Sequence, residues 1–317
     1  MKTGRAALAV LAAGSLFSLA SCAAYSDEPA TSTSGAGTGT VQVAVAFYPF
    51  EFIAERIGGD LVSVENLTAP GAEPHDLELT PQQVASLSTV DLVVYQSGFQ
   101  PAVDTAVEQA RPARTVDTAS FLTLLKASSD GAEDEDHDAA GEHGADDPHT
   151  WLDPTNMVRI AEHVRDALSE VRPADAAAFA ANTTALIADL TDLDAALRTD
   201  LTGCRIVPFI TSHAAFGYFA KRYGLTQIGI NGVEPDVEPS AARIAQVQQI
   251  ARTNGVTTIF FETLVSPVVA ESVAGDLGLK TAVLDPLEGI TAASPGTDYL
   301  EVMRANGSAL KKANACS

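Results

Sequence analysis

The stretch ADAAAFAANTTALIADLTDLDAALRT, residues 174–199, contains neither glycine nor proline. Four leucines recur in it at the spacing of one helix face: Leu186, Leu190, Leu193 and Leu197. Pro173 suits the first turn of such a helix. A helix of about 26 residues is about 39 Å long at the usual rise per residue. We expect a linking helix over residues 174–200 that joins two halves of the chain as a rigid rod. A long helix packed on one domain is the alternative.

On both sides of this stretch, short β-rich runs alternate with helical patterns. The strand candidates are residues 41–47, 61–66, 91–95, 205–211, 257–261 and 281–284. Several are continuous apolar runs, which are typical of buried parallel strands. Between two of them, residues 240–252 have an apolar helical face, a serine at the start and Gly255 beyond the end. The alternation predicts an α/β fold with parallel sheets. A chain of 317 residues suits two such lobes, at 41–173 and 201–317.

The composition is strongly acidic, with 41 acidic against 19 basic residues and a net charge of −22. No basic patch is available to neutralise phosphates, so nucleic acid is not an expected partner. An acidic surface attracts cations weakly, although an acidic secreted protein would have this charge without binding a metal. One run, SSDGAEDEDHDAAGEHGADD at 128–147, has no apolar stripe and is predicted to be a disordered loop. Its two histidines, His137 and His143, are candidates for transient metal contacts.

The N-terminus is typical of a targeting segment. Lys2 and Arg5 precede an apolar stretch, residues 6–20, that is too short to span a bilayer. It ends in LASC, which resembles the lipobox of bacterial lipoproteins; a plain signal peptide is the alternative. We expect a signal peptide over 1–21, a lipid-modified Cys22 that anchors the chain to the membrane, and a flexible tether over 22–40.

Two further cysteines are far from any histidine motif. If Cys22 carries lipid, Cys204 and Cys316 remain as a pair. In an oxidising compartment an even remainder suggests a disulfide, and two unpaired thiols are the alternative. Closing a loop of about a hundred residues contributes ~4–5 kcal/mol in the chain-entropy model.

Three histidines and one aspartate lie in loops that follow strand-like runs or stand between prolines. They are His75 in GAEPHDLELTP, His149 in DPHTWLDP, His213 in ITSHAAFGYF and Asp285 in AVLDPLEG. Ligands of open α/β sheets bind beyond the carboxyl ends of the strands. Imidazole nitrogens and one carboxylate oxygen are suitable donors for tetrahedral zinc. Each motif also has a simpler interpretation, since a single loop histidine is usually a surface residue and Asp285 could cap a turn.

Taken together and in this order behind a lipobox, these motifs resemble the zinc-binding solute-binding lipoproteins of ABC transporters, the ZnuA-like members of the TroA-like group. The resemblance covers the chain from about residue 41 to the end. It implies two α/β lobes joined by one long helix, with the metal in the interlobe cleft. It assigns His75, His149 and His213 as histidine ligands and Asp285 as the carboxylate ligand. Glu73 is an alternative oxygen ligand, because a nearby glutamate has that role in some relatives. The pair Cys204 and Cys316 resembles the disulfide of zinc-specific members.

The resemblance implies a lipid-anchored extracytoplasmic receptor that captures Zn²⁺ and delivers it to an ABC-type permease. We expect a monomer and no enzymatic activity. A manganese receptor is the nearest alternative, but manganese-binding relatives tend to carry glutamate where His213 stands, and imidazole suits zinc. A zinc hydrolase would need an open coordination position and a base such as Glu262, and the sequence has no HExxH motif. An adhesin with incidental zinc is the third alternative.

Overall fold

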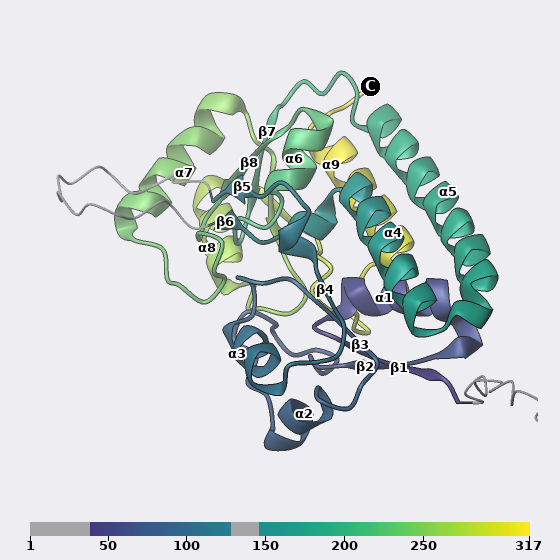
Figure 1. The fold of residues 1–317 in the computed structure, drawn as a ribbon. Coiled ribbons are helices and arrows are strands. Elements are labelled where there is room, and N and C mark those ends of the chain that lie inside the picture. Colours follow the sequence, from purple (N-terminus) through teal and green to yellow (C-terminus); the bar gives the residue numbers. More distant parts are fainter. Residues whose placement is uncertain (1–38, 128–145) are drawn as a thin grey trace, which may run out of the picture. The chain divides into compact units, whose positions relative to one another are not determined.

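The computed structural model describes residues 39–127 and 146–317, which all belong to one compact unit (Figure 1). Cys22, the signal peptide, His137 and His143 lie outside the described residues. Within the two described ranges, no helix has the length and apolar character needed to cross a membrane.

The first lobe is built on a four-stranded sheet in the order β2-β1-β3-β4. Its strands are β1 (Val41–Val45), β2 (Val62–Asn66), β3 (Leu92–Tyr95) and β4 (Thr115–Asp117), and every neighbouring pair is parallel. Its helices are α1 (Tyr48–Gly58), α2 (Pro81–Ser86), α3 (Pro101–Ala110) and α4 (Pro154–Val171). The three strands predicted here are confirmed. β4 was not predicted, because three residues are too few to show a periodicity. β5 (Leu125–Lys126) and β6 (Asp146–Asp147) form a small antiparallel ribbon.

The second lobe repeats this design with the sheet order β10-β9-β7-β8, again entirely parallel. Its strands are β7 (Pro208–Thr211), β8 (Thr226–Gly229), β9 (Thr258–Phe261) and β10 (Lys280–Val283). Its helices are α6 (Gly217–Tyr223), α7 (Ala241–Asn254), α8 (Val268–Leu277) and α9 (Tyr299–Ala313). α7 starts as predicted, with the Ser240 hydroxyl accepting the Arg243 N–H at 3.1 Å. It ends at Gly255, whose φ of 66° suits glycine.

The linking helix α5 spans Ala176–Asp200 and follows a short 3-10 turn at Pro173–Asp175. It packs on α1 and α4 of the first lobe and on α9 of the second (Figure 1). The four predicted leucines are buried. α9 approaches α5 closely at Gly307, where an added Cβ would lie 2.3 Å from the Leu197 side chain. The predicted rod between two lobes is therefore confirmed, and packing on one domain alone is excluded.

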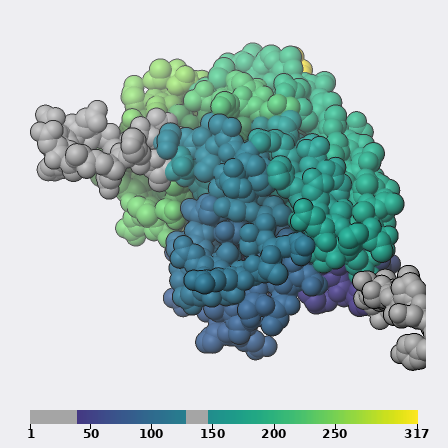
Figure 2. Space-filling view, in the orientation of Figure 1, coloured from purple at the N-terminus to yellow at the C-terminus, as the bar shows by residue number. Residues whose placement is uncertain are grey.

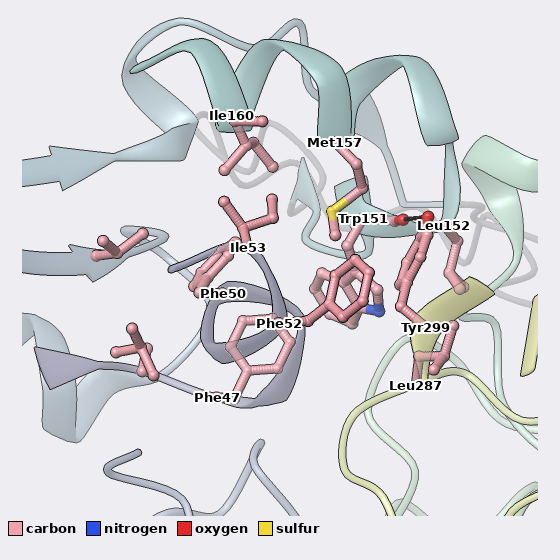
Figure 3. Close-up of a cluster of buried hydrophobic side chains, with 14 of the residues drawn as sticks. Phe47, Phe50, Phe52, Ile53, Trp151, Leu152, Met157, Ile160, Leu287 and Tyr299 are labelled. Carbon is pink, nitrogen blue, oxygen red and sulfur yellow. Dashed lines mark hydrogen bonds between the residues drawn. The ribbon is translucent and has the colours of Figure 1, made fainter. Parts of the chain in front are cut away.

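One hydrophobic core continues from the first lobe into the second (Figure 3). Phe52 of α1 stacks on Tyr299 of α9 with ring centroids 5.5 Å apart. Trp151 packs edge-on against Phe47 at 4.6 Å, and its carbonyl accepts the Tyr299 hydroxyl at 2.7 Å. On the face drawn in Figure 2, the first lobe in blue and the second in green meet without a wide gap. The lobes thus share an apolar contact close to the loops that carry the candidate ligands.

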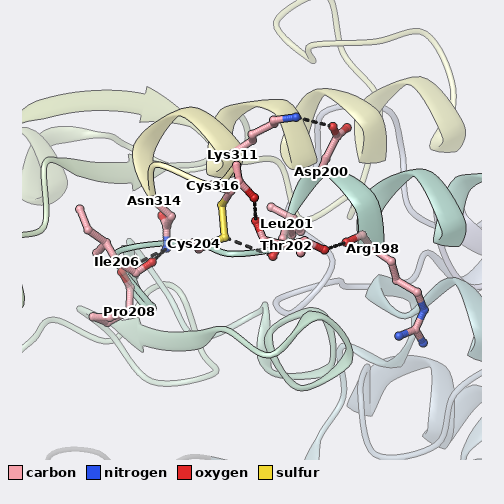
Figure 4. The surroundings of a disulfide bond; sticks show 11 residues. Arg198, Asp200, Leu201, Thr202, Cys204, Ile206, Pro208, Lys311, Asn314 and Cys316 are labelled. Carbon is pink, nitrogen blue, oxygen red and sulfur yellow. Dashed lines mark hydrogen bonds and ion pairs between the residues drawn. A yellow bond between two sulfur atoms is a disulfide. The ribbon is translucent and has the colours of Figure 1, made fainter.

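A disulfide joins Cys204, just after α5, to Cys316 near the chain end (Figure 4). Lys311 pairs with Asp200 at 2.9 Å, and Asn314 donates to the Ile206 carbonyl at 2.8 Å. The predicted pairing is confirmed, and it fastens α9 to the end of the linking helix.

Candidate metal site

The candidate ligands come from loops of both lobes. His75 lies in the loop after β2, and His149 lies two residues after β6, next to the start of α4. His213 follows β7 by two residues, and Glu288 follows β10 by five. The carboxyl ends of parallel strands meet at one edge of a sheet, and these edges converge between the two lobes.

Four side chains bring one donor atom each to a common point: His75, His149, His213 and Glu288. All four donor atoms lie within 4.8 Å of one another. Glu288 Oε1 is 3.4 Å from His75 Nε2, 3.2 Å from His149 Nε2 and 3.6 Å from His213 Nε2. The Nε2 atoms of His149 and His213 are 3.3 Å apart. Donors bound to one tetrahedral zinc at the usual bond lengths lie about 3.3–3.5 Å apart, so this spacing fits a single zinc ion.

The four ligand groups are almost fully removed from solvent. Their exposed fractions are 7% for His75, 0% for His149, 2% for His213 and 1% for Glu288. Aromatic rings form part of the wall, with Phe99 edge-on to His75 at 4.8 Å and Trp151 beside His149 at 5.2 Å. Buried charged groups are costly unless they are paired or bind a metal, so the burial of these four side chains suits a bound cation.

Each imidazole has a carboxylate at its other ring nitrogen. His149 Nδ1 donates to Asp147 at 2.8 Å, His213 Nδ1 donates to Glu262 at 2.7 Å, and His75 Nδ1 is 3.3 Å from Glu234. A carboxylate in this position holds the proton on Nδ1 and leaves Nε2 free to bind a metal. Asp147 and Glu234 were not predicted from the sequence, because only the folded structure shows that they face a histidine.

The electrostatics of the site favour positive charge. Burial lowers the pKa of His75, but the nearby carboxylates of Glu234 and Glu288 outweigh burial and raise this pKa to about 10. Burial also opposes charge on His213, yet Glu262 and Glu288 hold its pKa well above the usual value. Burial raises the pKa of Glu288, but hydrogen bonds from the three histidines hold this pKa well below its ordinary range. In the metal-free protein, protons on His75 and His213 therefore supply part of the positive charge that a bound cation would bring.

The carboxylate that converges with the three histidines differs from the predicted one. Asp285 is buried, but it is not among the four converging donors, and Glu288 stands there instead. Asp285 Oδ1 accepts the N–H of Leu287 at 2.8 Å, which is the turn-capping role that was the simpler interpretation. Both carboxylates lie in the motif AVLDPLEG. Proximity to the strand end favoured Asp285, whereas the path of the turn brings Glu288 to the histidines.

The other candidates lie outside the group of four. Glu73 Oε1 accepts the N–H of His75 at 3.1 Å, and burial together with the Glu288 carboxylate raises the Glu73 pKa to about 8. Glu262 Oε1 accepts hydrogen bonds from both His213 and the Ser212 hydroxyl. Glu262 therefore orients the ligand His213, and this oxygen is not free to act as a general base. His163, on the exposed face of α4, stacks on Phe121 with ring centroids 3.7 Å apart and lies outside the site.

Two parallel-sheet lobes joined by one long helix, with a buried ligand set between them, define a two-lobed solute-binding protein. The family described as ZnuA, zinc-uptake complex component A, periplasmic, matches residues 43–313, and the chain belongs to this family. The chain is 34% identical over 278 residues to the zinc-binding lipoprotein AdcA of Streptococcus pneumoniae, covering 86% of this chain and 55% of that relative. It thus spans about half the length of that relative.

Two further matches extend over nearly the whole of the other chain. The high-affinity zinc uptake system protein ZnuA of Bacillus subtilis is 33% identical over 306 residues, covering 93% of this chain and 96% of the relative. The crystal structure of the Zn(II)-bound ZnuA-like domain of Streptococcus pneumoniae AdcA is similar with a TM-score of 0.73 and 33% identity. This match covers 87% of the present chain and 99% of the other.

Proposed function

We propose that this protein is an extracytoplasmic receptor that captures Zn²⁺ and delivers it to an ABC-type membrane permease. The observation that carries the proposal is the set of four buried donor atoms, from both lobes, within 4.8 Å of one another. The family's description as a component of a zinc-uptake complex and the names of the relatives support it. These descriptions also support a binding role over an enzymatic one.

The donor set supports zinc over manganese as the cargo. Three nitrogen donors and one carboxylate suit zinc, whereas manganese prefers carboxylate and water oxygens. With neutral imidazoles, the bound ion and Glu288 carry a net charge of +1. The carboxylates of Asp147, Glu262 and Glu234 surround that charge. These carboxylates compensate the charge of the ion, so no further oxygen ligand is needed.

The same geometry disfavours a zinc hydrolase. A catalytic zinc keeps one coordination position open for water and has a base nearby. Here Glu288 occupies the fourth position, and Glu262 is hydrogen-bonded to His213. A closed four-ligand site is suited to holding an ion.

We further propose that the mature chain begins at a lipid-modified Cys22 and remains a monomer. The lipobox-like LASC motif and the name of the pneumococcal relative, a lipoprotein, support the anchor. The two lobes would extend over residues 41–173 and 201–317, with 174–200 as the linking helix.

Elemental analysis of the purified protein tests zinc capture directly. We expect one zinc per chain in the wild type and a loss of bound zinc in His149→Ala. His163→Ala is the matched control, because it removes a histidine of the same lobe that lies outside the site. Wild-type protein that binds no zinc, or binds manganese more tightly at equal free concentration, would refute the proposal. Zinc-limited growth of cells lacking the protein tests delivery: uptake should fall and be restored by the wild type but not by His149→Ala.

A further inference from the structure

A buried aspartate lies beside the ligand set and has all its polar groups bonded to protein. The two carboxylate oxygens of Asp285 accept the Leu287 N–H at 2.8 Å and the Thr263 hydroxyl at 3.1 Å. Its backbone N–H donates to Asn306 at 2.9 Å, and its carbonyl accepts from the Asn306 amide at 2.7 Å. An aspartate held in this way is suited to fixing backbone geometry.

The backbone that Asp285 fixes leads directly to Glu288. Leu287 has a φ of 61°, in the left-handed region that non-glycine residues rarely adopt. The Asp285 carboxylate bonds the N–H of this same residue, which is the hydrogen bond that stabilises such a turn. The Leu287 side chain is fully buried beside Trp151 and Tyr299 (Figure 3).

The turn is also tied to the loops that carry the histidines. The Pro286 carbonyl accepts the indole N–H of Trp151 at 2.7 Å, and Trp151 is two residues from His149. Thr263, which donates to Asp285, follows Glu262, the partner of His213. Residues 285–287 are thus held to both lobes, and Glu288 is the first residue after them.

We propose that Asp285 is a positioning residue for zinc binding: it holds the 285–288 turn so that the Glu288 carboxylate meets the three imidazoles. The inference rests on the proposed function and adds that a residue not touching the ion determines part of its affinity. Without the Asp285 carboxylate, Leu287 is free to leave the left-handed region. Glu288 then withdraws, and water takes the fourth coordination position.

A double-mutant cycle on the full protein tests this. Zinc dissociation constants are measured by chelator competition for the wild type, Asp285→Ala, Glu288→Ala and the double variant. We expect Asp285→Ala to weaken zinc binding by about 10–100-fold, the range for residues that orient metal ligands. We expect the double variant to bind no more weakly than Glu288→Ala alone, because Asp285 acts through Glu288. Effects that multiply would overturn the inference, since they would make Asp285 an independent contributor or a ligand.

Cobalt substitution distinguishes positioning from a general loss of stability. The visible absorption of bound Co²⁺ reports its coordination, so Asp285→Ala should shift the spectrum towards that of Glu288→Ala. Asp285→Asn keeps an oxygen for the Leu287 N–H and should restore most of the wild-type spectrum and affinity. Asp298→Ala is the control, because Asp298 caps α9 through the Glu301 N–H at 2.8 Å and should lower stability without changing either readout.

If Asp285→Ala does not fold, Thr263→Val takes its place in the double-mutant cycle with Glu288→Ala. Thr263→Val removes one hydrogen bond from the Asp285 carboxylate. A smaller loss of affinity that disappears in the Glu288→Ala background is expected. An Asp285→Ala or Thr263→Val protein with wild-type affinity and cobalt spectrum would overturn the inference. Wild-type protein that fails to bind zinc would instead refute the proposed function.

Discussion

His149 and His75 both belong to the first lobe, yet they are held in different ways. His149 pairs with Asp147, the last residue of β6 and two residues before it in the chain, and both side chains are buried. His75 pairs with Glu234 of the second lobe, and the Glu234 side chain is 59% exposed. The His149 pair is complete within one lobe, whereas the His75 pair requires the two lobes to be close. The difference identifies the His75 side as the place where we expect the ion to enter and leave.

The second lobe follows the pattern of His149. His213 pairs with Glu262 of the same lobe at 2.7 Å, and both side chains are 2% exposed. Two of the three imidazoles are therefore oriented by carboxylates of their own lobe. Only the third depends on an exposed carboxylate, whose interaction is weakened by solvent and salt.

The largest expected effect is the loss of a histidine ligand, and its size should depend on which histidine is lost. His149→Ala and His75→Ala should each weaken zinc binding more than about 100-fold, beyond the range for residues that only orient ligands. Because His149 is oriented in advance, its loss should cost more affinity than the loss of His75. Chelator competition measures both dissociation constants. Equal losses, or a greater loss for His75→Ala, would contradict the comparison.

The next effect is a dependence of zinc affinity on pH that extends above neutrality. With a pKa of about 10, His75 carries a proton at pH 7 that Zn²⁺ must displace. Affinity should therefore rise from pH 6 to pH 9, by up to about tenfold per pH unit for each proton displaced. In the metal-free protein the raised pKa of His75 stabilises the fold, and this effect has the opposite pH dependence. The stabilisation is complete below about pH 6.5 and is lost as pH rises towards 10.

Glu234→Gln separates His75 from the other titrating groups in that experiment. It removes the charge of one of the two carboxylates that raise the His75 pKa, so the rise of affinity between pH 7 and 9 should become shallower. Calorimetry in buffers of different ionisation enthalpy counts the protons released. An affinity that is constant above pH 7 in the wild type would show that no proton is displaced there.

Removal of the supporting carboxylates compares the two kinds of pair directly. Asp147→Ala should weaken zinc binding by about 10–100-fold, because the buried Asp147 carboxylate orients His149 from within the same lobe. Glu234→Ala should weaken binding less than about tenfold and act mainly by increasing the rate of zinc release. Stopped-flow transfer of zinc to a chelator measures that rate. A release rate in Glu234→Ala equal to that of the wild type would exclude the proposed exit side.

The smallest expected effect on zinc binding is that of the disulfide, which lies away from the ligand loops. Cys204→Ser with Cys316→Ser opens a link between residues 112 positions apart and should lower the free energy of unfolding by about 2–5 kcal/mol. Zinc affinity at 25 °C should not change. Denaturant unfolding and chelator competition on the same samples measure the two quantities. A loss of affinity would mean that α9, which carries Asn306, transmits the change to the 285–288 turn.

The sequence predicted most of what depends on local pattern. The linking helix was visible because its leucine spacing and lack of glycine and proline are properties of one continuous stretch. Longer strands such as β1 were visible for the same reason, whereas β4, at three residues, was too short to show a pattern. The three histidines could be singled out because each interrupts such a pattern at the end of a strand or between prolines.

What the sequence by itself determined is the pair of α/β lobes, their linking helix and the imidazole donors, since periodicity and loop position are properties of neighbouring residues. Only the tertiary structure decided which carboxylate joins them and which carboxylates stand behind them. Glu288, which follows the left-handed Leu287, converges with the three imidazoles and Asp285 does not, and Glu234 reaches His75 from the opposite lobe. Both outcomes depend on where a turn points and on which distant segments meet, and neither can be calculated from the order of residues in a single loop.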